Sequence, residues 1–281
     1  MHMRLKDYLV SLSLGLSLAL AAGVPSAAQG LPPVPEAIKK QGLLRVGVKC
    51  DYPPDGYLDA QGKPQGVEVS LAKQIAAYAF GSPDKVEFAC VTAANRIPSL
   101  QGGKIDLILA TLGVSAERAQ VIDFSDNYAW GGSDVLVPKD SPIKSLTDFA
   151  GKNVIVMKGA WQIGWFEKNV PSANLLKLDG ISDGLQALLQ KRADGFAHDL
   201  DVLRPIAKKN SDVKLVGEIY QLGYRAAGIR KGEKDWVDYV NAAVAQAKKD
   251  GLIAKWVKEH VEADLQQAVI DSWDIAKAPK S

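Results

Sequence analysis

The same short unit occurs twice in this chain, in residues 100–111 and again in residues 189–199. Each copy consists of a helix end, a basic turn, an aspartate, a short apolar strand, and a polar residue five positions after the aspartate. That polar residue is Thr111 in the first copy and Asp199 in the second. Ligands of open α/β sheets bind beyond the carboxyl ends of the strands. The repeat therefore predicts two facing sheets that bring Thr111 and Asp199 to opposite walls of one cleft.

Strands and helices alternate from Leu43 onward, which favours an α/β fold. A chain of 281 residues has room for one large or two small domains. Extended segments at residues 130–133 and 222–228 are the expected crossings between two lobes. The predicted domains are a signal peptide at 1–28, lobe 1 at 29–130 and 226–281, and lobe 2 at 131–225.

The N-terminus has the pattern of a secretory signal peptide. Arg4 and Lys6 precede an apolar run at residues 8–20, and small residues follow it up to Gln29. The alternative is a membrane anchor, but the run is shorter than the ~20 apolar residues that a membrane span requires. We therefore expect residues 1–28 to be removed and the mature chain to be exported to the periplasm as a soluble protein.

The two cysteines are both in the predicted mature chain. Cys50 ends one predicted strand and Cys90 lies in another. An exported protein enters an oxidising compartment, in which disulfides persist. A disulfide is expected if the two strands are neighbours, and the alternative is a pair of small buried thiols.

Arg118 is a candidate for binding an anion. It lies in the first turn of a predicted helix, close to the predicted N-cap Ser115. Free N–H groups and the helix dipole favour an anion at such a position, and a guanidinium beside them can hold a carboxylate through two hydrogen bonds. The alternative is a surface arginine that pairs with Glu117 or Asp123.

Asp199 is the complementary candidate. A buried carboxylate at a strand end needs a cationic partner, and a ligand ammonium would be one. The alternative is an N-cap for a helix that begins at Leu200, while the neighbouring His198 is expected to be a packed strand residue. Arg118 and Asp199 together predict a receptor for a zwitterion, with one charged end held by each lobe.

Five segments of the chain resemble the periplasmic amino-acid-binding proteins of ABC importers, which are the family 3 solute-binding proteins. The segments are Leu44–Val48, Gly66–Ala72, Ile97–Asp106, Ala116–Arg118 and Val121–Ser125. The resemblance covers essentially the whole mature chain. It implies the cluster B "Venus flytrap" architecture, a two-lobed periplasmic-binding-protein type II fold whose two open α/β sheets are joined by two hinge crossings.

The resemblance also implies roles for individual residues. Arg118 would take the ligand α-carboxylate, Asp199 would take the α-ammonium, and Thr111 and Gly113 would supply hydrogen bonds at the strand end. Tyr52 matches a pocket aromatic of the family. The implied partners are a small amino acid and a membrane ABC permease, and we expect a monomer without a cofactor.

The lobe-2 loop that completes the carboxylate site in the family corresponds to residues 158–161. Ala160 and Trp161 stand where the family often has hydroxyls. Trp161 is expected either to lie over the ligand as a lid or to pack against Trp165 and Phe166 at helical spacing.

The segment Asn95–Pro98 resembles the glutamate/aspartate-binding branch of the family, in which the arginine that corresponds to Arg96 lies in the site. Lys49 falls where that branch can carry a cation, so Arg96, Lys49 and Arg118 would form a positive pocket suited to a second carboxylate. Two alternatives are that Asp55, which replaces the usual phenylalanine, neutralises one cation, and that Arg96 belongs to a structural ion pair. We therefore rank acidic amino acids first and small or amide side chains second.

The alternative function is an exported enzyme, because cyclohexadienyl-dehydratase-like proteins resemble the same fold. Asp55 or Glu68 would then be the general acid, but the sequence shows no apolar pocket that would raise a carboxyl pKa. It also shows no nucleophilic triad, no metal-ligand cluster among three histidines and two cysteines, and no glycine-rich phosphate loop.

With 34 basic and 32 acidic residues, the composition gives no case for a nucleic-acid surface. A sensor input domain is a third option, disfavoured because no membrane span follows, so a solute-binding protein is the predicted function.

Overall fold

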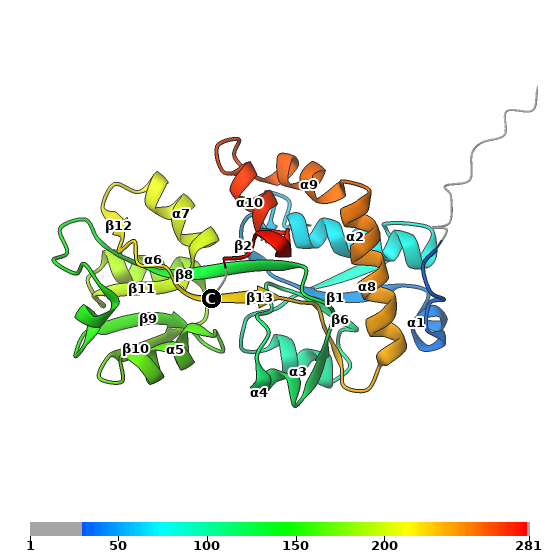
Figure 1. The fold of residues 1–281 in the computed structure, drawn as a ribbon, viewed down its shortest axis with the longest axis horizontal. Helices are drawn as coiled ribbons and strands as arrows, with labels where there is room; N and C mark the ends of the chain where they lie inside the picture. The colour runs from blue at the N-terminus through cyan, green and yellow to red at the C-terminus, as the bar shows by residue number, and fades with distance from the viewer. Residues whose placement is uncertain (1–29, 280–281) are drawn as a thin grey trace, which may run out of the picture.

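The computed structural model describes residues 30–279, which form two lobes with one open sheet each (Figure 1). The first sheet has the strand order β5 (Val86–Cys90), β1 (Leu44–Val48), β6 (Leu107–Leu109), β14 (Gly228–Arg230) and β7 (Ile122–Phe124). The second has the order β10 (Asn174–Leu178), β9 (Asn153–Met157), β11 (Gly195–Asp199), β8 (Ala129–Pro138) and β12 (Val213–Leu215), and β13 (Tyr220–Arg225) also pairs with β8. The predicted α/β fold with two open sheets is confirmed.

Helices cover the sheets of both lobes (Figure 1). Those of the lobe built on the first sheet are α1 (Glu36–Gln41), α2 (Val67–Phe80), α3 (Arg96–Gln101), α4 (Ala116–Ala119), α8 (Lys234–Lys249), α9 (Leu252–His260) and α10 (Gln266–Ser272). Those of the other lobe are α5 (Gln162–Asn169), α6 (Ile181–Leu189) and α7 (Leu200–Lys209). Two short 3-10 turns, η1 (Leu146–Phe149) and η2 (Ile275–Lys277), and a small sheet of β2 (Asp51–Tyr52), β3 (Gly56–Leu58) and β4 (Pro64–Gln65) complete the elements.

The helix α2 shows how the apolar pattern builds the first core. Val67, Leu71 and Ile75 recur at helical spacing and are fully buried in the same cluster as strand β1. Each such side chain contributes roughly 1.5–3 kcal/mol when it leaves water. Gly81 ends the helix with φ +77°, a left-handed conformation that glycine adopts without strain.

Because some strands in each sheet pair in parallel, the carboxyl ends of those strands meet at the same edge of that sheet. In the first sheet β1 is parallel to β5 and β6, and in the second β9 is parallel to β10 and β11. The carboxyl ends of β6 and β11 therefore lie with those of their neighbours. Thr111 lies two residues beyond the end of β6, and Asp199 is the last residue of β11.

The strands β8 and β13 run side by side between the two lobes (Figure 1). They are antiparallel, with Tyr224 opposite Trp130 and Gly223 opposite Gly131. The indole nitrogen of Trp130 donates to the carbonyls of the C-terminal segment 271–274, at 3.0 Å in each case. The C-terminal segment thus packs against one crossing, while the domain boundaries at 130 and 225 stay a prediction.

The two cysteines lie close to the ends of the neighbouring strands β1 and β5, which is the arrangement that a disulfide requires. Cys90 is opposite Val48 in the β1–β5 ladder, and Cys50 follows that strand end. Cys50 and Cys90 form a disulfide with a Cα–Cα distance of 5.5 Å. In the chain-entropy account a bridge of this loop length contributes roughly 4 kcal/mol, and here it also anchors the segment that carries Lys49 and Tyr52.

The signal peptide predicted at 1–28 lies outside the described residues. Within residues 30–279, none of the helices combines the length and the apolar character needed to cross a membrane. The described part of the chain is accounted for by the two lobes and their crossings.

Candidate functional site

One cavity between the lobes gathers every ligand-binding residue that the sequence predicts. Its lining includes Lys49, Tyr52, Arg96, Thr111, Gly113, Arg118, Ala160, Trp161 and Asp199. The cavity volume is about 40 Å³, far below the ~300–1,000 Å³ of pockets that take drug-sized ligands. A larger groove of about 520 Å³ is lined by residues of α6, α7, α9 and α10, but by none of the predicted ones.

Arg118 reaches the cavity from the single turn α4. The Ser115 hydroxyl oxygen accepts a hydrogen bond from the Arg118 backbone N–H at 3.2 Å, so Ser115 is the N-cap, as predicted. The guanidinium donates from Nη1 to the Gly113 carbonyl at 2.6 Å and from Nη2 to the Gly159 carbonyl at 3.0 Å. Gly113 and Gly159 belong to opposite lobes, so Arg118 connects the two walls. Burial lowers the pKa of the guanidinium, but an arginine remains charged at neutral pH.

The lobe-2 loop packs directly against the first lobe. Gly159 has φ +72°, and a Cβ atom there would lie 2.7 Å from the Ala93 carbonyl oxygen and 2.9 Å from the Ala94 Cα. Glycine alone fits this left-handed position without pushing the two backbones apart. The loop that carries Ala160 and Trp161 therefore closes over the cavity.

Asp199 ends β11 and is surrounded by donors. Its Oδ2 accepts from the Tyr52 hydroxyl at 2.6 Å, and its Oδ1 accepts from Trp161 Nε1 at 2.8 Å and Gln162 Nε2 at 2.7 Å. Arg225 Nη2 lies 3.5 Å from Oδ2. Burial opposes ionisation of Asp199, but Arg225 and the hydrogen bonds outweigh it, so the pKa of this carboxyl lies below its usual value. The side chain makes no capping bond to α7.

Arg225, at the end of β13, lies within a buried group of acidic side chains. Its Nη1 is 3.1 Å from Asp55 Oδ2, and its Nη2 is 3.3 Å from Asp201 Oδ2 and 3.0 Å from the Tyr52 hydroxyl. Burial raises the pKa of Asp55 to about 8 despite Arg225, because one guanidinium cannot neutralise several carboxylates at once. Asp55 thus pairs with Arg225, and not with the cations Lys49, Arg96 or Arg118.

We expect the protein to lose stability as the pH rises from about 4 to about 8. The folded state keeps a proton on Asp55 up to a pKa of about 8, whereas an unfolded aspartate releases it near pH ~4. Unfolding therefore releases protons in this window, and the free energy of unfolding falls as the pH rises. Thermal melts across the window should show a weaker dependence in Asp55→Asn than in the wild type. The same slope in Asp55→Asn as in the exposed control Asp140→Asn would assign the effect to another group.

Two of the predicted pocket cations have partners in the protein. Arg96 Nη1 donates to the carbonyls of Ala110 and Thr111, the latter at 3.2 Å, and burial lowers the pKa of Arg96 to about 9. Lys49 Nζ lies 2.8 Å from Asp51 Oδ1. Arg96 therefore braces the strand end through carbonyls, and Lys49 belongs to an ion pair at the edge of the cavity.

Thr111 has φ +49°, a left-handed conformation that is rare for a β-branched residue. Its backbone N–H donates to the Glu68 carboxylate at 2.8 Å, and its Oγ1 donates to the Ala110 carbonyl at 2.8 Å. Glu68 also accepts from the Tyr128 hydroxyl. Neither Glu68 nor Asp55, the carboxyls expected to serve an enzyme as general acid, lines the cavity.

Trp161 lies in the cavity wall. Its ring fills the space in front of two glycines, since a Cβ would come within 2.8 Å of it at Gly113 and within 2.0 Å at Gly223. Trp165 and Phe166 pack against each other and against a different aromatic of lobe 2. Of the two expected arrangements, a lid at the cavity and packing against Trp165 and Phe166, the structure has Trp161 at the cavity.

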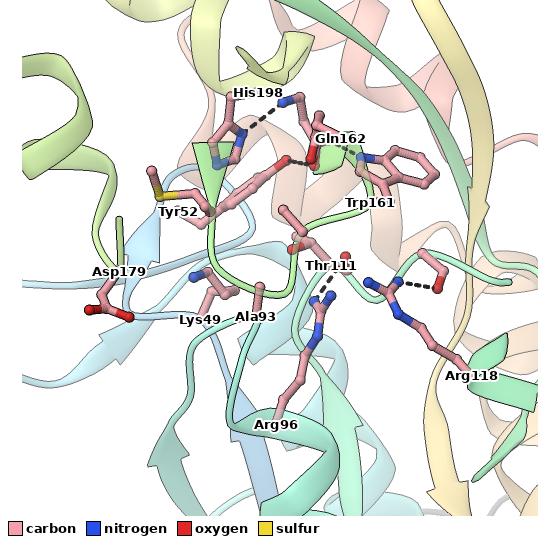
Figure 2. A pocket seen from close by; sticks show the side chains of 14 residues that line it. Lys49, Tyr52, Ala93, Arg96, Thr111, Arg118, Trp161, Gln162, Asp179 and His198 are labelled. Carbon is pink, nitrogen blue, oxygen red and sulfur yellow. Dashed lines mark hydrogen bonds between the residues drawn. The ribbon is translucent and has the colours of Figure 1, made fainter. Parts of the chain in front are cut away.

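The sequence reasoning missed part of the lining, which also includes Ala93, Met157, Gln162, Asp179 and His198 (Figure 2). Met157 ends β9 and Asp179 follows β10, so the strand-end rule that selected Asp199 could have found both. Gln162 follows Trp161 directly. His198 was expected to be a packed strand residue, and it is buried, but its ring also reaches the cavity.

Two open sheets that face one small, charged cavity define a two-lobed ligand-binding protein. The family model described as bacterial extracellular solute-binding proteins, family 3, matches residues 44–263. The chain belongs to this family, as the sequence motifs had indicated.

Three relatives place the chain within the family. The glutamine-binding protein GlnH of an ABC transporter from Bacillus subtilis is 32% identical, over 79% of this chain and 84% of that protein. The crystal structure of the solute receptor for L-cysteine from Neisseria gonorrhoeae is 38% identical with a TM-score of 0.77, over 80% of this chain and 92% of that one. The cysteine-binding protein of Campylobacter jejuni is 34% identical with a TM-score of 0.77, over 81% and 92%. These relatives are named for binding, and the chain is a binding protein rather than an enzyme.

Proposed function

We propose that this protein captures a small neutral α-amino acid in the interlobe cavity. The observation that carries the proposal is the placement of Arg118 and Asp199 on the walls of one cavity of about 40 Å³. Arg118 has five N–H donors, and carbonyls accept from two of its nitrogens, so donors remain for the ligand α-carboxylate. Asp199 supplies the negative charge for the α-ammonium.

Ligand binding must rearrange the donors around Asp199. A carboxylate offers about four lone-pair sites, and four side chains already approach this one. Tyr52, Gln162 and Arg225 are buried, whereas Trp161 is partly exposed. The ammonium therefore takes the place of the Trp161 indole N–H, and the loop at 158–161 adjusts around the bound ligand.

The side chain of the ligand is best matched by a short neutral group. The cavity is small, and Lys49, which would read a side-chain carboxylate, is neutralised by Asp51 at 2.8 Å. Arg96 is directed at two backbone carbonyls. Two relatives with solved structures are named for cysteine and a curated one for glutamine, all neutral amino acids. Cysteine is our first candidate, and the acidic amino acids ranked first from the sequence become the alternative.

The biological setting follows from the family and the N-terminal sequence. The predicted signal peptide at 1–28 supports export to the periplasm. We propose that the closed, loaded protein docks as a monomer on a membrane ABC permease. Closure is a hinge motion about the paired crossings β8 and β13.

A calorimetric titration of ligand-free protein with each standard amino acid tests the proposal. We expect binding of L-cysteine and other small neutral amino acids, with glutamate and aspartate weaker. Tighter binding of glutamate or aspartate than of the neutral amino acids would show that the ligand is an acidic amino acid. No binding of any amino acid would overturn the proposed function.

Arg118→Ala should weaken binding of every amino acid that the wild type binds, by roughly 10–100-fold. A charge-assisted hydrogen bond is worth ~1.5–3 kcal/mol, and 1.4 kcal/mol is tenfold in affinity. Calorimetry on the variant measures the loss. Arg192→Ala, an exposed arginine far along the chain, is the control and should bind normally. Unchanged affinity in Arg118→Ala would refute the carboxylate role.

A further inference from the structure

His198 lines the cavity, and the scheme above gives its imidazole no role. It lies directly before Asp199 on β11 and is 7% exposed. Its imidazole packs beside Tyr52 and Phe196, with ring centroids 5.5 and 5.6 Å away. Figure 2 shows the ring next to Tyr52, on the side of the pocket away from Arg118. The ring is therefore placed beside the ammonium site and opposite the carboxylate site.

The hydrogen bonds determine which nitrogen of His198 carries the proton. The backbone N–H of Asp199 donates to His198 Nδ1 at 2.7 Å. A backbone N–H can only donate, so Nδ1 must present its lone pair and the proton of the neutral ring must be on Nε2. Among residues 30–279 no acceptor for Nε2 is found, while the side chain lines the cavity. His198 thus offers one N–H donor that the protein itself leaves unused.

We infer that His198 selects the ligand side chain, by donating a hydrogen bond from Nε2–H to an acceptor at the γ position. The side chains that fit are those of cysteine and serine, which carry sulfur or oxygen at that position, whereas alanine has none. The inference rests on the proposed function, because it takes Asp199 as the partner of the α-ammonium. The ammonium and the γ atom of an amino acid are only a few bonds apart, and Asp199 and His198 are neighbours in the chain.

The imidazole is held in its neutral form. Burial lowers the pKa of His198 to about 4, and a second proton would have to displace the Asp199 N–H from Nδ1. The charged groups that act on the ring are Asp199, Lys49, Asp51 and Arg225, of mixed sign. The donor is therefore present unchanged at every pH at which the protein is expected to work.

A matched pair of variants separates the donor from the packing. His198→Asn keeps a short acceptor for the Asp199 N–H but has no group that reaches as far as Nε2. His198→Gln places an amide N–H at about the reach of Nε2. Calorimetry with L-cysteine, L-serine and L-alanine on the wild type and both variants gives the comparison. L-alanine reports whether the zwitterion site is intact, since it lacks the γ acceptor.

We expect His198→Asn to lower the affinity for L-cysteine and L-serine about 10-fold, and to lower the affinity for L-alanine by less than about threefold. His198→Gln should recover part of the loss. In the wild type, the ratio of L-serine to L-alanine affinity should stay constant between about pH 5 and 8, where an ordinary histidine titrates. Equal losses for all three ligands, or a wild type that binds L-alanine as tightly as L-serine and L-cysteine, would overturn the role of His198 and leave the proposed function standing. A wild type that binds none of the three would overturn both.

Discussion

Asp199→Asn should abolish most of the affinity for amino acids, with a loss of at least about 30-fold. Removing one partner of a buried, hydrogen-bonded charge pair costs ~2–5 kcal/mol, and 1.4 kcal/mol is tenfold in affinity. Asparagine keeps the shape of the side chain and an oxygen that accepts from Tyr52 or Trp161, so the pocket should remain assembled. Calorimetry with L-cysteine measures the loss directly.

Asp201→Asn is the control for this substitution. Asp201 also lies near Arg225, at 3.3 Å, but does not line the cavity. Asp201→Asn should therefore change affinity by less than about threefold. A second measurement uses 3-mercaptopropionate, which is cysteine without its ammonium group. Asp199→Asn should lower the affinity for L-cysteine far more than the affinity for this analogue. An equal loss of affinity for the two compounds would show that Asp199 does not bind the ligand ammonium.

Arg225→Met should destabilise the fold by ~3–5 kcal/mol, because it leaves the buried Asp199 carboxylate without the cation that it shares with Asp55 and Asp201. For a protein of this size the melting temperature should fall by roughly 6–20 °C. The loss should be smaller at low pH, where these acids are protonated. Thermal melts followed by circular dichroism at two pH values provide the measurement.

A double variant tests whether the destabilisation comes from an unpaired buried charge. Arg225→Met combined with Asp199→Asn should be less harmful than the sum of the two changes, because the double variant removes the charge that Arg225→Met leaves unpaired. Arg204→Met, an exposed arginine on the neighbouring α7, serves as the control and should stay within about 0.5 kcal/mol of the wild type. A melting temperature of Arg225→Met close to that of Arg204→Met would show that the acidic group does not depend on its guanidinium.

Local patterns sufficed for the elements of the fold. In helix α8 (Lys234–Lys249), the buried residues Trp236, Val240, Ala243 and Ala247 recur at helical spacing. Apolar spacing and glycine stops are properties of neighbouring residues, so they can be read before any packing is known. The strand-end rule worked for the same reason, since the positions of Thr111 just beyond β6 and of Asp199 at the end of β11 are a matter of chain order.

The contacts within the site were harder to foresee. Arg225 was placed in a crossing segment without a role, yet it is bonded to Asp55, 170 residues away in the chain. His198 was assigned to packing, because neither the proton on Nε2 nor the open side of its ring can be inferred from residue types. Both depend on which groups the two lobes bring together when they close.

The amino-acid sequence by itself therefore determined the two-sheet α/β fold, the family, and nine of the residues that meet in the cavity, because each follows from periodicity, chain order or motif. Tertiary structure alone decided how the charges are shared. Arg118 spans both walls, Arg225 serves several acids, and Lys49 is neutralised by Asp51. A Coulomb interaction depends on distance and burial, and neither quantity exists for residues far apart in a chain until the chain has folded.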